Sequence, residues 1–153
     1  MIACIQRVSQ AEVEVNGQTC GQIGVGMLIL VGVAENDEEL DIQLLAEKAV
    51  GLRIFEDSDG KTNLSLSDVQ GEILCISQFT LLADCRKGRR PSFTQAAAPE
   101  KGNQYYQKFV ELLRKSGATV QTGIFQTNMK VSLVNQGPFT IILNSQRLRE
   151  KRG

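Results

Sequence analysis

Two short polar segments interrupt otherwise apolar stretches of this sequence, and both could do chemistry. The first, residues 77–81, reads Ser-Gln-Phe-Thr-Leu and ends an apolar run that begins near Glu72. Where a buried strand leaves its sheet, backbone N–H groups can point at a ligand oxygen, which is what stabilisation of an oxyanion requires. The alternative is an ordinary strand end, at which Ser77, Gln78 and Thr80 are satisfied by their neighbours. The segment alone leaves both interpretations open.

The second polar segment, residues 135–140, reads Asn-Gln-Gly-Pro-Phe-Thr. It separates two apolar runs, at 131–134 and 139–143, that are typical of strands. Proline has no N–H to donate to a sheet ladder and should not lie inside a central strand. The simplest interpretation of Gly137-Pro138 is therefore a hairpin turn between two strands.

The sequence contains no histidine. This absence excludes Ser-His-Asp and Cys-His catalytic arrangements and every histidine metal site. A hydrolase with Thr80 or Cys85 as its nucleophile would lack the base that activates such groups. The four cysteines, which show no CxxC spacing, are Cys4, Cys20, Cys75 and Cys85. We therefore expect no metal and no cofactor, and free thiols in a reducing, cytoplasmic compartment.

Charge is balanced overall, with 17 basic and 17 acidic residues, but the basic residues concentrate in two clusters. These are a loop cluster of Arg86, Lys87, Arg89 and Arg90, and a tail of Arg147, Arg149, Lys151 and Arg152. Such an uneven distribution can steer a phosphate-bearing ligand to one face despite zero net charge. The plainer alternative is two mobile, solvated segments.

Periodicity and turn residues predict the elements that position these segments. We expect strands at about 2–8, 11–15, 18–23, 27–33, 72–79, 119–122, 129–135 and 139–144, and helices at about 37–54 and 99–116. Asn16-Gly17 is a strong hairpin signal because both turn positions favour positive φ. The longest apolar run, residues 25–34, is far short of the ~20 residues that a membrane span needs, and the opening residues lack the basic region of a signal peptide. We expect one α/β domain with helices packed on one side of its strands.

The two polar segments and the sequence around them resemble those of a known family. SQFTL at 77–81 and NQGPFT at 135–140 resemble the two signature motifs of the D-aminoacyl-tRNA deacylases, in the family's order. The similarity covers nearly the whole chain, through MIACIQRVSQAEVEVNG, GLRIFEDSDGKTNLSLSDV, KGRRPSF and TGIFQTNMKVSLVNQGP. Gln136 stands where many relatives carry Asp, and the basic extension after Asn144 is longer than in the shortest relatives. Two intact motifs in order are far more specific than one short pattern.

The resemblance implies both an architecture and a reaction. The architecture is a single domain over residues 1–153, a layered two-sheet α/β fold of mixed and antiparallel strands with two helices packed on one side, ending in a basic tail at 145–153. The protein is expected to be a homodimer without a membrane partner. The reaction is hydrolysis of the ester that joins a D-amino acid, or glycine, to the terminal adenosine of tRNA. In this family no side chain is thought to act as the essential base, and the 2′-hydroxyl of the terminal ribose assists.

The resemblance assigns the choice between D- and L-substrates to Gly137-Pro138. It implies that this peptide bond is cis and that the dipeptide of one subunit enters the pocket of its partner. There its carbonyl oxygens would crowd the position of an L side chain, so that selection works by exclusion. Arg7 resembles the arginine that orients these carbonyls, and Thr140 supports the same motif.

The first motif is implied to hold the reacting ester. Gln78 and Thr80 are the candidate catalytic residues, and we favour a hydrogen-bonding or structural role for Thr80 because no adjacent His or Lys would activate it as a nucleophile. The implied substrate-binding residues are Ser77, Phe79, Met129 and Asn135. Met129 either lines an adenine pocket or simply fills the core, as Met often does.

The same resemblance implies that the loop cluster binds tRNA. Its residues precede Pro91-Ser92-Phe93 in a loop, where they could meet phosphates of the tRNA acceptor stem. The rival function, from another class, is a dimeric module that binds RNA ends without catalysis. Both motifs are intact, which favours the enzyme, whereas a change at Gly137 would have favoured the rival.

Overall fold

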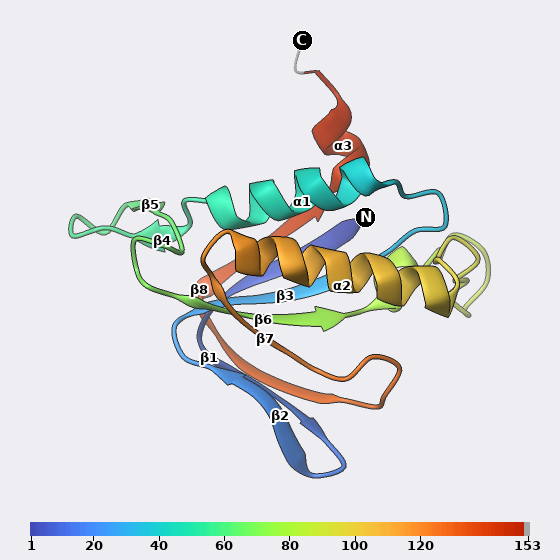
Figure 1. Ribbon diagram of the computed structural model, residues 1–153, viewed down its shortest axis with the longest axis horizontal. Coiled ribbons are helices and arrows are strands. Elements are labelled where there is room, and N and C mark those ends of the chain that lie inside the picture. The colour runs from blue at the N-terminus through green and yellow to red at the C-terminus, as the bar shows by residue number, and fades with distance from the viewer. Residues whose placement is uncertain (152–153) are drawn as a thin grey trace.

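The computed structural model describes residues 1–151 (Figure 1). Its strands are β1 (Ile2–Val15), β2 (Gln18–Ile23), β3 (Gly26–Gly32), β4 (Phe55–Glu56), β5 (Thr62–Leu64), β6 (Glu72–Ser77), β7 (Thr119–Thr122) and β8 (Lys130–Asn144). Its helices are α1 (Glu39–Gly51), the 3₁₀ helix η1 (Phe79–Leu82), α2 (Pro99–Lys115) and α3 (Ser145–Arg149). Strands form from the β-branched and apolar runs, and α2 begins at Pro99, which suits the first turn of a helix.

One six-stranded sheet, in the order β2-β1-β3-β6-β7, runs through the molecule, and β8 pairs with the other edge of β1. The first half of β1 pairs with β3 and its second half with β2, whereas β8 runs antiparallel along nearly its whole length. The β3–β6 and β6–β7 pairs are parallel, so the sheet is mixed. Because β1 exchanges β3 for β2 midway, its second half departs from β3, β6 and β7 together with β2 and the first half of β8, toward the bottom of Figure 1.

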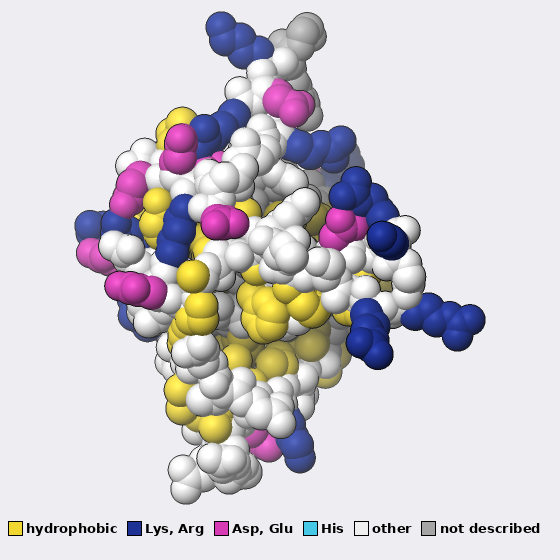
Figure 2. Space-filling view, turned by 90° about the vertical axis from the view of Figure 1, so that its right-hand side faces the viewer, with side chains coloured by type: hydrophobic (Ala, Val, Ile, Leu, Met, Phe, Trp, Pro, Cys, Tyr) yellow, Lys and Arg dark blue, Asp and Glu magenta, His cyan; other side chains and the backbone are white. Residues whose placement is uncertain are grey.

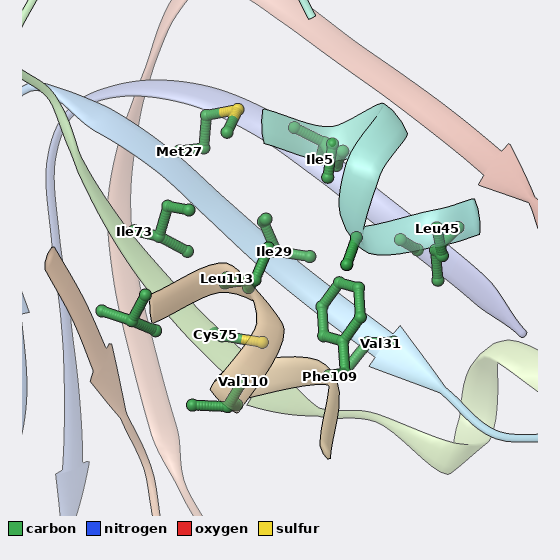
Figure 3. Close-up of a cluster of buried hydrophobic side chains, with 14 of the residues drawn as sticks. Ile5, Met27, Ile29, Val31, Leu45, Ile73, Cys75, Phe109, Val110 and Leu113 are labelled. Atoms are coloured by element: carbon green, nitrogen blue, oxygen red, sulfur yellow. The ribbon is translucent and has the colours of Figure 1, made fainter. Parts of the chain in front are cut away.

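Two hydrophobic cores lie on the two faces of the bent sheet. The first lies between the sheet and the helices α1 and α2, where Phe109 and Leu113 of α2 meet Ile29 and Ile73 of the sheet (Figure 3). The second lies inside the bend, and it joins residues of β1 and β2 to Leu74 and others of β3 and β6. Strands β3 and β6 are thus buried on both faces, which explains their nearly continuous apolar sequences.

A charged network ties the start of β1 to α1 and α3. The Met1 ammonium donates to Asp37 and to the Ser145 hydroxyl, at 2.6 Å in each case. Arg149 donates to the fully buried Asp41, which also accepts the Glu38 N–H in a capping box at the start of α1. Burial would raise the pKa of Asp41, but these hydrogen bonds and nearby positive charges hold it below its ordinary value. The sequence reasoning missed this network.

Most predicted elements are present, and the main differences are in how the strands join and in the tail. The strands expected at 2–8 and 11–15 form one strand, β1, and those expected at 129–135 and 139–144 form one strand, β8, so the hairpin turn predicted at Gly137-Pro138 is wrong. The structure has one six-stranded sheet and a small β4–β5 pair rather than two layered sheets. The basic tail begins as the helix α3, held by Arg149, and Arg152 lies outside the described residues.

Candidate functional site

The first motif forms one wall of a cavity. β6 ends at Ser77, the Gln78 N–H donates to the Val31 carbonyl at 2.8 Å, and the chain then turns into η1. The cavity beside this turn measures 590 Å³. Its lining comes from β6 and η1, the loop before α2, the start of α2 and the β7–β8 connection, and includes Ser77, Gln78, Phe79, Phe93, Phe125 and Met129. A larger groove of 1110 Å³ between α1, α3 and β8 contains none of the predicted catalytic residues.

Aromatic rings give the cavity its shape. Phe79 meets Phe93 edge to face, with ring centroids 5.2 Å apart, and Phe79 remains 56% exposed. Phe125 stacks on Tyr106, whose hydroxyl donates to the buried Cys75 carbonyl at 2.7 Å. Such rings offer flat apolar surface to a planar ligand. In Figure 2, hydrophobic side chains gather over the middle of the face that carries the 83–98 loop, and the Lys and Arg side chains of this view are densest at its right-hand margin.

The polar groups of the first motif divide into two kinds. The Gln78 amide donates to the Thr80 hydroxyl at 2.5 Å, so these side chains are engaged with each other, and Thr80 does not line the cavity. The N–H groups of Phe79 and Thr80, in contrast, lie in the first turn of η1, where a helix offers no acceptor of its own. Backbone donors so placed are suited to a developing oxyanion.

The β7–β8 connection forms the facing wall, and sequence reasoning missed most of it. Gln126, Thr127 and Asn128 all line the cavity, and Gln126 has a positive φ of 59°. The only sequence signal was their place in the similar stretch TGIFQTNM. Met129 lines the cavity and also packs against the second core.

The second motif lies within β8 as a bulge. The Gly137-Pro138 peptide bond is cis, and both residues are exposed. Arg7 is 7% exposed; its Nε donates to the Gln136 carbonyl at 2.8 Å and its Nη1 to the Ile54 carbonyl at 2.7 Å. Asn135 bonds with Phe139 and Thr140 rather than facing the cavity.

The two motifs do not meet within one chain. Ser77 of β6 pairs with Val31 of β3, which in turn pairs with Ala3 of β1, so Ser77 lies level with Ala3 in the sheet. The bulge of β8 lies opposite Arg7 of β1. The separation is four residues along the strands and three strand spacings across the sheet, or roughly 20 Å at ~3.3 Å per residue and ~4.8 Å per spacing. Neither Gly137 nor Pro138 lines the cavity.

The loop cluster is exposed but one of its charges is neutralised. Asp84 and Ser92 exchange backbone hydrogen bonds and close the loop, and Gly88 has a φ of +71°. Arg86 donates to both carboxylate oxygens of Asp84, at 2.9 and 2.7 Å. These side-chain hydrogen bonds lower the pKa of Asp84 to about 2. Lys87, Arg89 and Arg90 make no ion pair among the described residues, so three charges are free.

Within residues 1–151, no group of three or more Cys, Asp or Glu side chains is placed to hold a metal ion. In the same part of the chain, no helix has both the length and the apolar character needed to cross a bilayer.

Comparison with known proteins gives extensive matches. A model of the family described as D-Tyr-tRNA(Tyr) deacylase matches residues 4–144. A protein of Thermotoga petrophila named D-aminoacyl-tRNA deacylase is 56% identical over 148 residues, 97% of this chain and 99% of its own length. One of Geobacter sulfurreducens with the same name is 57% identical over 146 residues, 95% and 96% of the two chains. A solved structure named c-Myc DNA Unwinding Element Binding Protein is 39% identical, with a TM-score of 0.89 over 94% of this chain and 98% of that one.

Proposed function

Because the chain belongs to the D-Tyr-tRNA(Tyr) deacylase family, we propose that it hydrolyses the ester of D-aminoacyl-tRNA and of glycyl-tRNA. The products are free tRNA and the amino acid. The observation that carries this proposal is the cavity beside Ser77, Gln78 and Phe79, which combines aromatic walls with backbone donors at the end of a buried strand. The whole chain acts as one domain in the cytoplasm, where aminoacylated tRNA is found.

Catalysis proceeds without a side-chain base. The chain has no histidine, and among the described residues the side-chain partner of the Thr80 hydroxyl is the neutral Gln78 amide, which is no base. Backbone N–H groups of η1 stabilise the oxyanion that forms on the ester carbonyl. The 2′-hydroxyl of the terminal ribose assists the attack of water, and Gln78 helps to hold the ester in position. No cofactor takes part.

A second copy of the chain completes the site as a homodimer. The separation of the two motifs and the exposure of Gly137 and Pro138 support this arrangement, because the dipeptide of one copy is free to enter the cavity of the other. Ile142 and Val134 on β8 are 60% and 45% exposed and would be covered by a partner. Inside the cavity, the dipeptide excludes the side chain of an L-residue, whereas a D-residue or glycine presents hydrogen at that position.

The acceptor end of the tRNA also contacts the loop cluster. Lys87, Arg89 and Arg90 project from a closed loop, and Phe93 at the base of the same loop lines the cavity. Phosphates of the acceptor stem would thus meet three free charges while the terminal adenosine occupies the cavity.

Deacylation of D-Tyr-, L-Tyr- and Gly-tRNA tests the proposal directly. We expect release of D-tyrosine and glycine and no release of L-tyrosine. Comparable cleavage of the D- and L-esters would refute selection by exclusion. Binding of tRNA without cleavage of any ester would favour the rival module that binds RNA ends.

A further inference from the structure

The bulge in β8 leaves some of its backbone without a partner strand. Between the pairs Gln6–Thr140 and Val8–Asn135, β1 contributes one residue, whereas β8 contributes four, at 136–139. Extra residues in a bulge lose their ladder hydrogen bonds to the neighbouring strand. The backbone on each side of Gly137-Pro138 is therefore bonded by side chains rather than by the backbone of β1.

Asn135 takes the place of that strand at one end of the bulge. The Phe139 N–H donates to Asn135 Oδ1 at 2.6 Å, and Asn135 Nδ2 donates back to the Phe139 carbonyl at 3.3 Å. The same Nδ2 donates to Thr140 Oγ1 at 3.0 Å. One carboxamide thus satisfies both backbone groups of a single residue, as a paired strand would. A carboxamide has only two N–H donors, and both are used here.

Arg7 holds the other end. Its Nε donates to the Gln136 carbonyl at 2.8 Å, and its guanidinium lies over the Phe139 ring, 4.7 Å from the centroid. Among the described residues, no side chain forms a hydrogen bond with Gly137 or Pro138 themselves. The position of the dipeptide is therefore set by the two residues that flank it, one held by Arg7 and the other by Asn135.

We propose that Asn135 is a positioning residue that sets the discrimination between D- and L-esters, and that it is not a ligand of the substrate. This inference rests on the proposed function. An L-side chain presses on the Gly137-Pro138 surface, and the surface rejects it only if it cannot recede. Without the Asn135 carboxamide, Phe139 is released and the dipeptide can move back. A D-ester does not press on this surface, so its cleavage depends much less on the hydrogen bonds between Asn135 and Phe139.

The test compares Asn135→Asp and Asn135→Ala with a control on the same strand, Ser132→Ala. The Asp variant keeps the shape and the acceptor for the Phe139 N–H but loses both donors. Ser132 is exposed and its side chain makes no hydrogen bond in the described part of the chain. The readout is kcat/KM for D-Tyr-tRNA divided by kcat/KM for L-Tyr-tRNA, with the urea midpoint measured on each variant.

We expect the ratio to fall in both Asn135 variants through a gain on the L-ester. Each lost hydrogen bond changes an equilibrium about fivefold. The Thr140 hydroxyl can donate to the new carboxylate, so Asn135→Asp loses only the bond to the Phe139 carbonyl and should lower the ratio by about fivefold. Asn135→Ala, which loses all three bonds, should lower it by more. Ser132→Ala should leave the ratio unchanged.

Two results would overturn the inference. Parallel loss on both esters with an unchanged ratio would show that Asn135 supports only the fold, and a raised KM for the D-ester alone would make it a substrate ligand. If the wild-type protein cleaves both esters equally, the proposed function itself fails, and the inference falls with it.

Discussion

Roughly 20 Å separates the two motifs within one chain, and this distance makes a sharp prediction about subunits. If the dipeptide of one copy completes the cavity of the other, a chain defective in the dipeptide can be rescued by a chain defective in the cavity. Gly137→Ala supplies the first defect. A Cβ at this position would lie 2.9 Å from Arg7 Nη2, on a φ of +142° that L-residues rarely adopt. Gln78→Ala supplies the second.

The expected recovery follows from counting sites. When equal amounts of the two variants are coexpressed and assemble at random, half of the dimers contain one chain of each kind. In such a dimer, the cavity of the Gly137→Ala chain receives an intact dipeptide, whereas the other site combines both defects. The mixture should therefore show about a quarter of wild-type activity, and the purified mixed dimer about half.

The assay is deacylation of D-Tyr-tRNA, with different affinity tags on the two chains so that the mixed dimer can be isolated. Each variant alone should be nearly inactive, and refolding of the two separately purified variants without mixing provides the control. A mixed dimer with no more activity than either variant alone would place each complete site within a single chain. Provided that the wild-type protein cleaves D-Tyr-tRNA in the same assay, that result would refute the argument from distance.

Three further outcomes are expected. Replacing Lys87, Arg89 and Arg90 by Ala should weaken tRNA binding and reduce the slope of log K against log salt by roughly two to three, while cleavage of a short aminoacyl-adenosine ester stays unchanged; equal loss on both substrates would contradict a phosphate role. Thr80→Ala should retain much of the activity and a 2′-deoxyribose substrate should lose most of it, whereas a dead Thr80→Ala variant that still binds substrate would restore the nucleophile model. Asp41→Asn should lower the urea midpoint at pH 7. Folding lowers the pKa of Asp41, so the ionised carboxylate stabilises the folded protein at pH values above its unfolded pKa of about 3.9. This stabilisation is lost progressively as the pH falls from there through the lower pKa of the folded state. An equal difference in urea midpoint between Asp41→Asn and the wild type at pH 7 and at pH 3 would contradict the assignment.

Local sequence signals predicted much of the fold. The Asn16-Gly17 turn, the doubly buried strand β3 and the helix begun by Pro99 are each specified by residues near in sequence, and each lies where it was expected. Helix α1 was expected to begin at about 37 but begins at Glu39, because Asp37 turns to the Met1 ammonium instead of capping the helix. That contact joins residues 36 positions apart, so no local pattern could reveal it.

The candidate site likewise contains residues that a local sequence pattern predicted and residues that only long-range strand pairing brings to it. The segment 77–81 was singled out by its polar residues at the end of an apolar run, and it does form a cavity wall. Gln126 and Asn128 carry no distinctive local pattern, and they reach the cavity only because β7 lies beside β6 in the sheet. The engagement of Asn135 with Phe139 depends in turn on a bulge whose size is fixed by pairing with β1, a strand more than a hundred residues away.

The place of Gly137-Pro138 within a strand, where a hairpin was expected, matters for the proposed selection. The tip of a hairpin loop is among the parts of a protein that open most easily. A bulge in β8, in contrast, is flanked by paired residues on both sides, from Lys130 to Asn135 and from Thr140 to Asn144. It can move only if those pairs or the bonds to Arg7 and Asn135 break. Exclusion of an L-residue has to distinguish a carbon from a hydrogen at one position, which a yielding surface cannot do. β8 pairs only with β1 and carries a bulge at this point, and edge strands and bulges are the places in a sheet where proline is tolerated. A rigid, exposed Gly-Pro surface can therefore form within this strand, which a hairpin tip would not provide.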